Sequence, residues 1–197
     1  MPGTLQIPIF PLGTVLYPEG MLPLRIFEQR YLDMTKVCIR DDAPFGVCLI
    51  REGLEVGSPA VPWDTGCTAH ITQWDMPHLG LFHLITQGDA VFRILEQWHT
   101  KSGLIQAQVE LYDPLPAQAL PDEFQLLAEL LDKLLRKLGA ERSPAPARMD
   151  DAVWVGYRLA ELLPLDADVR QQLLEARDPL LTLGEVQRFL DSHKVSV

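Results

Sequence analysis

The sequence predicts an α+β protein, with a β-rich part containing one helix over residues 1–115 and a helical bundle over residues 116–197. Up to residue 115, short apolar runs and alternating segments are separated by turns rich in Gly and Pro, which is typical of a small barrel or sandwich. Beyond residue 115, leucines recur at helical spacing. Three prolines, Pro114, Pro116 and Pro121, mark the junction between the two patterns.

The strands of the first part are predicted from their apolar patterns. Residues 104–112 form the clearest strand, because its apolar and polar residues alternate from Ile105 to Leu111, so one face is apolar and the other polar. Residues 67–72 alternate in the same way. Three denser apolar runs favour strands buried on both faces: 45–50, 81–86 and 91–95. A turn is expected between the last two, at Gly88-Asp89.

One helix interrupts these strands, because Phe27, Tyr31, Met34 and Cys38 recur at helical spacing. Before it, residues 7–12 contain two prolines. Since proline lacks the N–H that a ladder needs, this stretch is confined to an edge or an irregular crossing.

The second part carries four apolar patterns of helical period. The expected helices cover residues 122–138, 150–163, 166–177 and 183–193. The last is expected to begin with a capping box formed by Thr182 and Glu185.

Length and charge limit the function. A chain of 197 residues should bury about 70% of the surface that it exposes when unfolded, and 47% of its residues are hydrophobic. Seven basic residues stand against thirteen acidic ones up to residue 115, and ten against fourteen after it, for a net charge of −10. Because nucleic-acid binding needs clustered Lys and Arg, both parts disfavour it.

The sequence indicates a cytoplasmic protein without a membrane partner. No apolar run approaches the roughly 20 residues that span a bilayer, and residues 1–6 lack the features of a signal peptide. Three cysteines, Cys38, Cys48 and Cys67, cannot all pair within one chain, and none forms a C-x-x-C motif. They are interpreted as reduced, buried side chains.

No catalytic residue or cofactor is predicted. The sequence contains no P-loop, no G-x-G-x-x-G, no H-E-x-x-H and no G-x-S-x-G motif. A hydrolase without these motifs is the weakest of the functional hypotheses. Cys48 lies in an apolar run where a thiol is inert, which disfavours a thiol catalyst.

No metal site is predicted either. His70, His83 and His99 lie on expected strands, and Cys67 is close to His70 in the sequence. A metal needs three or four converging ligands, and none of the usual ligand spacings is present. Ordinary structural histidines are the preferred interpretation.

Three aromatic residues are candidates for peptide binding: Trp63, Trp74 and Phe82. Trp63 and Trp74 lie beside expected turns, where a large apolar side chain is less obliged to enter the core. Exposed aromatics favour contact with proteins and peptides. Packing in the core or at a sheet edge remains the alternative for each one, and for Trp98.

The first part also resembles a known family. The composite of residues 7–12, 15–18 and 22–31 is followed by Phe45-Gly46-Val47, by residues 66–71 and by residues 88–94. This pattern resembles the substrate-binding amino-terminal domain of the ATP-dependent Lon proteases, and its stand-alone bacterial members in particular. The helical part adds weaker similarities over residues 162–165, 172–175 and 186–190.

The resemblance implies a PUA-like β pseudo-barrel followed by a helical bundle, with Phe27 and Tyr31 facing the core. It implies recognition of unfolded or apolar protein segments, as a non-catalytic adaptor in protein quality control. The ATPase and Ser–Lys peptidase motifs of the full-length proteases are absent from the sequence. A small-molecule or RNA-binding protein is the alternative, because PUA-like barrels often bind RNA, although the charge of −10 disfavours RNA.

Overall fold

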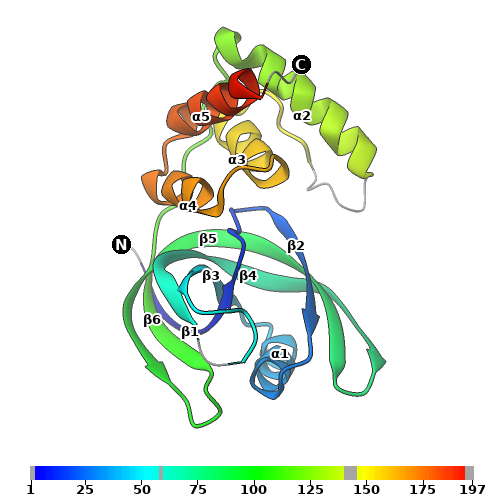
Figure 1. Cartoon of the computed structure of the whole chain (residues 1–197), viewed down its shortest axis with the longest axis vertical. Coiled ribbons are helices and arrows are strands. Elements are labelled where there is room, and N and C mark those ends of the chain that lie inside the picture. Colours follow the sequence, from blue (N-terminus) through cyan, green and yellow to red (C-terminus); the bar gives the residue numbers. More distant parts are fainter. Residues whose placement is uncertain (1–2, 58–59, 140–145, 194–197) are drawn as a thin grey trace. The chain divides into compact units, whose positions relative to one another are not determined.

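The computed structural model describes residues 3–57, 60–139 and 146–193. The chain forms two compact units, Met1–Pro114 and Leu115–Val197. Within the described residues, the first unit contains a six-stranded sheet and one helix, and the second contains four α-helices (Figure 1). The α+β class predicted from the sequence is confirmed.

The first unit is a closed barrel with one additional strand. Its elements are β1 (Thr4–Leu12), β2 (Met21–Ile26), α1 (Gln29–Asp41), β3 (Phe45–Glu52), β4 (Val61–His78), β5 (Leu81–His99) and β6 (Ile105–Leu111). The strands follow the order β2-β5-β4-β3-β1-β6, and β6 pairs again with β5. Five strands therefore close on themselves, while among the described residues β2 pairs with β5 alone and forms an edge (Figure 1).

The proline-rich strand β1 changes partner in its middle. It pairs antiparallel with β6 over Thr4–Ile9 and parallel with β3 over Ile9–Leu12. Pro8 and Pro11 each lie where only one side of β1 is paired, so their missing N–H groups need not interrupt a second ladder. This is the irregular crossing that the two prolines predict.

The turn expected at Gly88-Asp89 is wrong, because β5 runs through both residues. The Gly88 N–H donates to the Gly20 carbonyl at 2.8 Å, and the Gly88 carbonyl accepts from the Glu19 N–H at 2.8 Å. A Cβ at position 88 would collide with the carbonyl oxygen of Tyr17. Glycine is needed here because the backbone of residues 17–20 approaches β5 closely.

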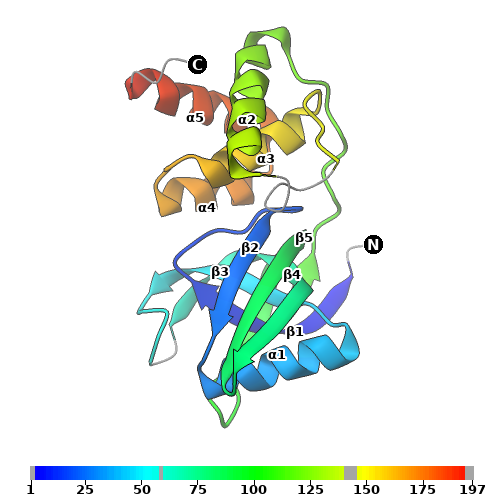
Figure 2. The same cartoon turned by 90° about the vertical axis from the view of Figure 1, so that its right-hand side faces the viewer.

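Helix α1 lies across one end of the barrel (Figure 2). Its buried residues Tyr31, Met34 and Cys38 belong to a core cluster that includes Phe45. The expectation that Phe27 also faces the core is wrong, since its side chain is 56% exposed. The helix begins only at Gln29, so Phe27 lies in the connection from β2 and escapes the buried face.

The second unit contains a 3-10 turn and four α-helices. They are η1 (Asp122–Phe124), α2 (Gln125–Leu138), α3 (Ala152–Leu162), α4 (Ala167–Ala176) and α5 (Pro179–Ser192). The core of this unit includes Leu127 and Leu131 of α2, Leu159 of α3 and Leu183 of α5, all fully buried.

The capping box expected at Thr182 is wrong. Helix α5 begins one turn earlier, where the Asp178 carboxylate accepts the N–H groups of Leu180 at 3.0 Å and Leu181 at 3.1 Å. Pro179 occupies the first turn, where its missing N–H costs nothing. The Thr182 hydroxyl lies inside the helix and donates to the Asp178 carbonyl at 2.9 Å.

Within residues 3–57, 60–139 and 146–193, no helix combines the length and the apolar character needed to cross a membrane.

Candidate functional site

Two of the three candidate aromatics meet at the β4–β5 hairpin. The rings of Trp74 and Phe82 lie edge to face with their centroids 6.0 Å apart. Trp74 is 54% exposed, whereas Phe82 is only 5% exposed and belongs to the core below it. The exposure expected of Phe82 is therefore not observed, and its ring supports Trp74 from beneath.

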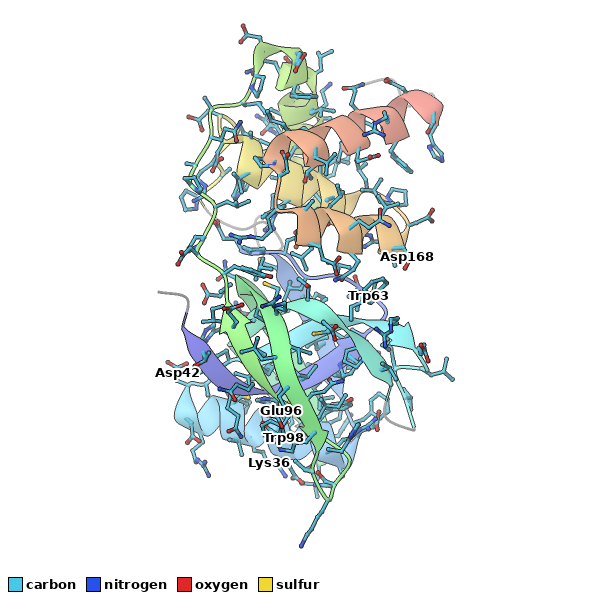
Figure 3. The ribbon with its side chains drawn as sticks, turned by 90° about the vertical axis from the view of Figure 1, so that its left-hand side faces the viewer. Lys36, Asp42, Trp63, Glu96, Trp98 and Asp168 are labelled. Atoms are coloured by element: carbon cyan, nitrogen blue, oxygen red, sulfur yellow. The ribbon has the colours of Figure 1, made fainter. Side chains whose placement is uncertain are left out.

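Trp63 lies elsewhere on the sheet. It is half-buried near the beginning of β4, eleven residues before Trp74 on the same strand. Extended strands rise about 3.3 Å per residue, so the two indoles cannot share one small patch. Trp98 is 38% exposed near the end of β5. Figure 3 shows Trp63 and Trp98 toward opposite ends of the barrel.

The hairpin exposes further apolar side chains that the sequence reasoning missed. Met76 is 43% exposed and Leu79 is 99% exposed at the turn between β4 and β5. We call Trp74, Met76 and Leu79 the hairpin tip. The signal was available, because a turn segment that carries such large apolar residues has no core to enter.

The second feature is a hollow of about 370 Å³ beside β2, which we call the edge groove. One wall is β2 with the first residues after it, and the other comes from β1 and the loop after β3. The lining residues are Phe10, Leu12, Thr14, the segment 22–28, Tyr31, Glu55 and Val56.

Strand β2 presents two different faces. Leu22 and Leu24 are half-buried and pack on the core cluster, while Pro23 and Arg25 are exposed. The Thr86 hydroxyl of β5 donates to the Leu22 carbonyl at 2.9 Å and reinforces the single pairing of β2. The sequence analysis did not identify this strand. A proline inside an alternating apolar run was the available signal, because it is typical of an edge strand.

The charges around the edge groove are mostly engaged. The Glu28 carboxylate lies 2.9 Å from Nη2 of Arg30, and Glu55 Oε1 accepts the Gly13 N–H at 2.5 Å. Arg25 has an exposed side chain with no ion pair recorded among the residues that the structure describes. Burial raises the pKa of the Tyr31 hydroxyl, so this phenol stays neutral at physiological pH.

Arg30 connects the groove to two loops. It is only 7% exposed, and its guanidinium lies 4.7 Å from the centroid of the Tyr31 ring. Nη1 donates to the Gly103 carbonyl at 3.3 Å, and Nη2 donates to the Gly57 carbonyl at 3.1 Å. Because Gly57 follows Glu55 and Val56 directly, this bond holds the outer wall of the edge groove.

A second apolar hollow of about 400 Å³ lies along α1, and we call it the helix hollow. Its walls come from α1, β1 and the segments around residues 43–44 and 102–106. Met34, Val37 and Cys38 line it from the helix. Burial raises the pKa of the Cys38 thiol to about 11, with a smaller contribution from Asp41. A thiol in this state is a poor nucleophile.

The histidines do not converge. His70 Nε2 lies 3.9 Å from the Asp89 carboxylate, and both side chains are largely exposed. In the strand register, His83 lies opposite Arg25 of β2 and Asp75 of β4, and His99 lies opposite Ile105 of β6. In the described part of the chain, no three His, Cys, Asp or Glu side chains are grouped to hold a metal ion.

Cys48 and Cys67 are buried members of the two core clusters of the barrel. Burial is the main cause that raises the pKa of the Cys48 thiol far above its ordinary value, and Asp64 and Cys67 add to the shift. The Cys48 thiol therefore stays protonated, which is the opposite of what a thiol catalyst requires.

The fold places the chain in the class of Lon N-terminal domains. A crystal structure of a Lon N-terminal domain protein from Xanthomonas campestris superimposes with a TM-score of 0.77 at 35% identity. The match covers 93% of this chain and 98% of that one. The N-terminal domain of a Mycobacterium avium complex Lon protease shares the fold, with a TM-score of 0.60 at 16% identity over 98% of this chain and all of that one.

The family model of the substrate-binding domain of ATP-dependent protease La (LON) matches residues 6–192, and the chain belongs to this family. Two relatives are 27% identical to it: a Lon protease from Anaeromyxobacter dehalogenans, over 86% of this chain, and a Lon protease 2 from Herpetosiphon aurantiacus, over 87%. The chain spans about a fifth of the length of these relatives, 21% and 22% respectively.

Proposed function

We propose that this protein binds extended apolar segments of unfolded proteins in the edge groove. It acts as a non-catalytic module, an adaptor in protein quality control in the bacterial cytoplasm. The observation that carries the proposal is an apolar groove beside an unpaired strand edge, in a chain of the LON substrate-binding family.

The apolar side chains around the groove support this proposal. Phe27 is 56% exposed, and Val56 lies 55% exposed across the groove from β2. Leu54, in the same loop, is 77% exposed. Large apolar side chains that remain in water around a concave site are typical of protein-binding surfaces.

The hairpin tip is proposed as a second contact for the same clients. Trp74 offers a half-exposed indole with the Phe82 ring fixed beneath it, so little conformational entropy is lost when a client residue packs on it. Trp63, the third candidate, is proposed only as a weaker contact, because it lies far along β4.

The finer fold description belongs to the same proposal. The barrel of the first unit is proposed to be PUA-like, and residues 1–115 and 116–197 are proposed to act as a β domain and a helical bundle. The small-molecule or RNA alternative has less support, since the net charge of −10 repels phosphate. A labelled single-stranded RNA should therefore show no salt-sensitive binding.

The proposal is tested with reduced, carboxymethylated α-lactalbumin as an unfolded client and the native form as its control. Fluorescence anisotropy should detect binding of the unfolded form only. Equal binding of both forms, or of neither, contradicts the proposal. Incubation with casein should produce no fragments, and fragments that track with the purified chain would contradict the non-catalytic assignment.

The contribution of the hairpin tip has a matched control. Trp74→Ala should weaken client binding by about tenfold, which corresponds to about 1.4 kcal/mol. Trp98→Ala removes a similarly exposed indole elsewhere on β5 and should leave the affinity unchanged. If both substitutions change the affinity equally, the hairpin tip makes no specific contribution to client binding.

A further inference from the structure

We propose that a client segment binds the edge groove as an added β-strand, hydrogen-bonded to the free edge of β2. This inference rests on the proposed function and deepens it by naming the substrate class. The segment is extended, has apolar side chains at alternate positions, and carries an acidic residue on its opposite face. Its backbone, rather than a particular sequence, supplies most of the contacts.

The register of β2 with β5 shows which backbone N–H and C=O groups of β2 point toward β5 and which point away from it. The pairs of β2 with β5 continue in register to Gly20 and Gly88, where the Gly88 N–H donates to the Gly20 carbonyl at 2.8 Å. In an antiparallel ladder, backbone groups at alternate residues point to the same side. Leu22, Leu24 and Ile26 therefore direct their backbone groups toward β5.

Met21, Pro23 and Arg25 consequently direct theirs to the outer edge. This edge offers three carbonyl oxygens but only two N–H groups, because Pro23 has none. No hydrogen bond to these outward groups is recorded within the described residues. Unpaired edge groups of this kind are a template for another strand.

Pro23 also limits how an added strand can align. A partner strand loses one hydrogen bond wherever its carbonyl faces Pro23, and it keeps the bonds at Met21 and Arg25. The proline thus weakens unspecific pairing along this edge, and it favours registers that place no client carbonyl opposite it.

The side chains on the two faces of β2 define what the added strand should carry. Leu22 and Leu24 point toward the core side, where Phe10 and Leu12 complete the apolar lining of the groove. Client side chains on this face enter the hollow. Because side chains alternate along a strand, the neighbouring client residues lie on the face of Pro23 and Arg25.

The exposed guanidinium of Arg25 favours an acidic residue on that second face. Glu28 is held by Arg30 at 2.9 Å, and the Glu55 carboxylate accepts the Gly13 N–H. Arg25 is the lining charge for which the described residues show no partner. A client carboxylate beside Arg25 is therefore complementary, while a lysine there is not.

The test uses an acetylated, amidated peptide of the sequence Ser-Leu-Glu-Val-Ser-Leu-Gln, N-methylated at alternate backbone nitrogens in two sets. One set methylates the nitrogens of the apolar residues and the other set those of the polar residues. Only one set of nitrogens can face β2, so one peptide should lose at least tenfold in affinity while the other binds like the parent. Isothermal titration calorimetry measures both.

A protein variant tests the same edge from the other side. Arg25→Pro removes the outward N–H without removing a bond to β5, and Arg25→Ala removes the charge alone. We expect Arg25→Pro to weaken peptide binding about tenfold beyond Arg25→Ala, with circular dichroism confirming the fold. Replacing the peptide Glu by Gln should weaken binding to the wild type but not to Arg25→Ala.

The outcomes separate the two proposals. If unfolded α-lactalbumin binds but both methylated peptides bind equally, strand addition is overturned and the proposed function stands. If the unfolded protein does not bind, the proposed function fails with it. If sedimentation shows a dimer that Arg25→Pro dissociates, a second copy occupies the edge and the client assignment is overturned.

Discussion

The edge groove and the helix hollow are similar in size, about 370 and 400 Å³, and both are mainly apolar. They differ in the backbone that borders them. Beside the helix hollow, the backbone of α1 is satisfied within the helix, while β1 pairs over Thr4–Pro8 with β6 on one side only among the described residues. Beside the edge groove, β2 has one side with no partner strand in the part of the chain that the structure describes. Volume and apolarity alone therefore do not distinguish the two hollows, and the proposal that clients bind the edge groove depends on the outward backbone groups of β2.

The largest expected effect concerns the support of β2. Gly88→Ala forces a methyl group against the Tyr17 carbonyl and disturbs the two bonds to Glu19 and Gly20. We expect a loss of about 4 kcal/mol in the free energy of unfolding, measured with urea. Gly80→Ala, at a positive φ with open space around it, should cost only about 1 kcal/mol. Equal losses would show that the approach of residues 17–20 does not hold β2.

The next effect concerns Arg30, which lines the helix hollow and also donates to the Gly57 carbonyl next to the wall of the edge groove. Arg30→Ala leaves Glu28 without its partner and frees the Gly57 and Gly103 carbonyls. We expect the free energy of unfolding, measured by thermal or urea denaturation, to fall by about 3 kcal/mol. Arg93→Ala breaks an exposed pair with Glu110 and should cost about 0.5 kcal/mol. If the Arg30 variant keeps wild-type stability and client affinity, Arg30 does not hold the wall of the edge groove.

A third prediction separates the two hollows directly. Phe27→Glu places a charge in the edge groove, and Val37→Glu places one in the helix hollow. Both side chains are about half exposed, 56% and 46%, so the fold should tolerate both changes. Anisotropy with the unfolded client should show at least a tenfold loss, about 1.4 kcal/mol, for Phe27→Glu alone. A larger loss of client affinity for Val37→Glu would instead indicate that clients bind the helix hollow.

The smallest effect belongs to the helix hollow. Cys38 has a pKa of about 11 in the folded chain, above its ordinary value of 9.0. The unfolded chain therefore releases this proton first, and the stability that the neutral thiol contributes below pH 9 is lost as the pH rises through about 11. Between pH 8 and pH 10 the free energy of unfolding should fall by about 1 kcal/mol more in the wild type than in Cys38→Ala. Parallel pH profiles for the two proteins would contradict this assignment.

The sequence predicted best the elements with a strong local period. The alternation over residues 104–112 corresponds to β6, and the leucine stripe after residue 122 corresponds to α2. The prediction from the sequence failed where contact with a distant segment of the backbone determines the local structure. Gly88 resembled a turn residue, but it is a contact point for residues 17–20, and nothing local to position 88 records that approach.

The candidate site was predicted in part for the same reason. Trp63 and Trp74 were expected beside turns, and Trp74 does lie close to the turn between β4 and β5, but only the tertiary structure shows that Trp74 is exposed while its neighbour Phe82 belongs to the core. The edge groove was missed because its walls come from three separate segments, residues 10–14, 22–31 and 55–56, and their meeting depends on tertiary structure. Pro23 was the one local signal of an edge strand, because a proline within an alternating apolar run is typical of such strands.

The change of partner within β1 has a consequence for biosynthesis. Among the described residues, Thr4–Pro8 of β1 pair only with β6, whose residues emerge from the ribosome about a hundred positions later. The barrel therefore cannot close during most of the translation of the first unit. Until β6 is translated, Ile7 and Ile9 lack the β6 residues of their core cluster. A nascent chain with such a late closing step leaves the apolar residues of β1 exposed until β6 has been translated.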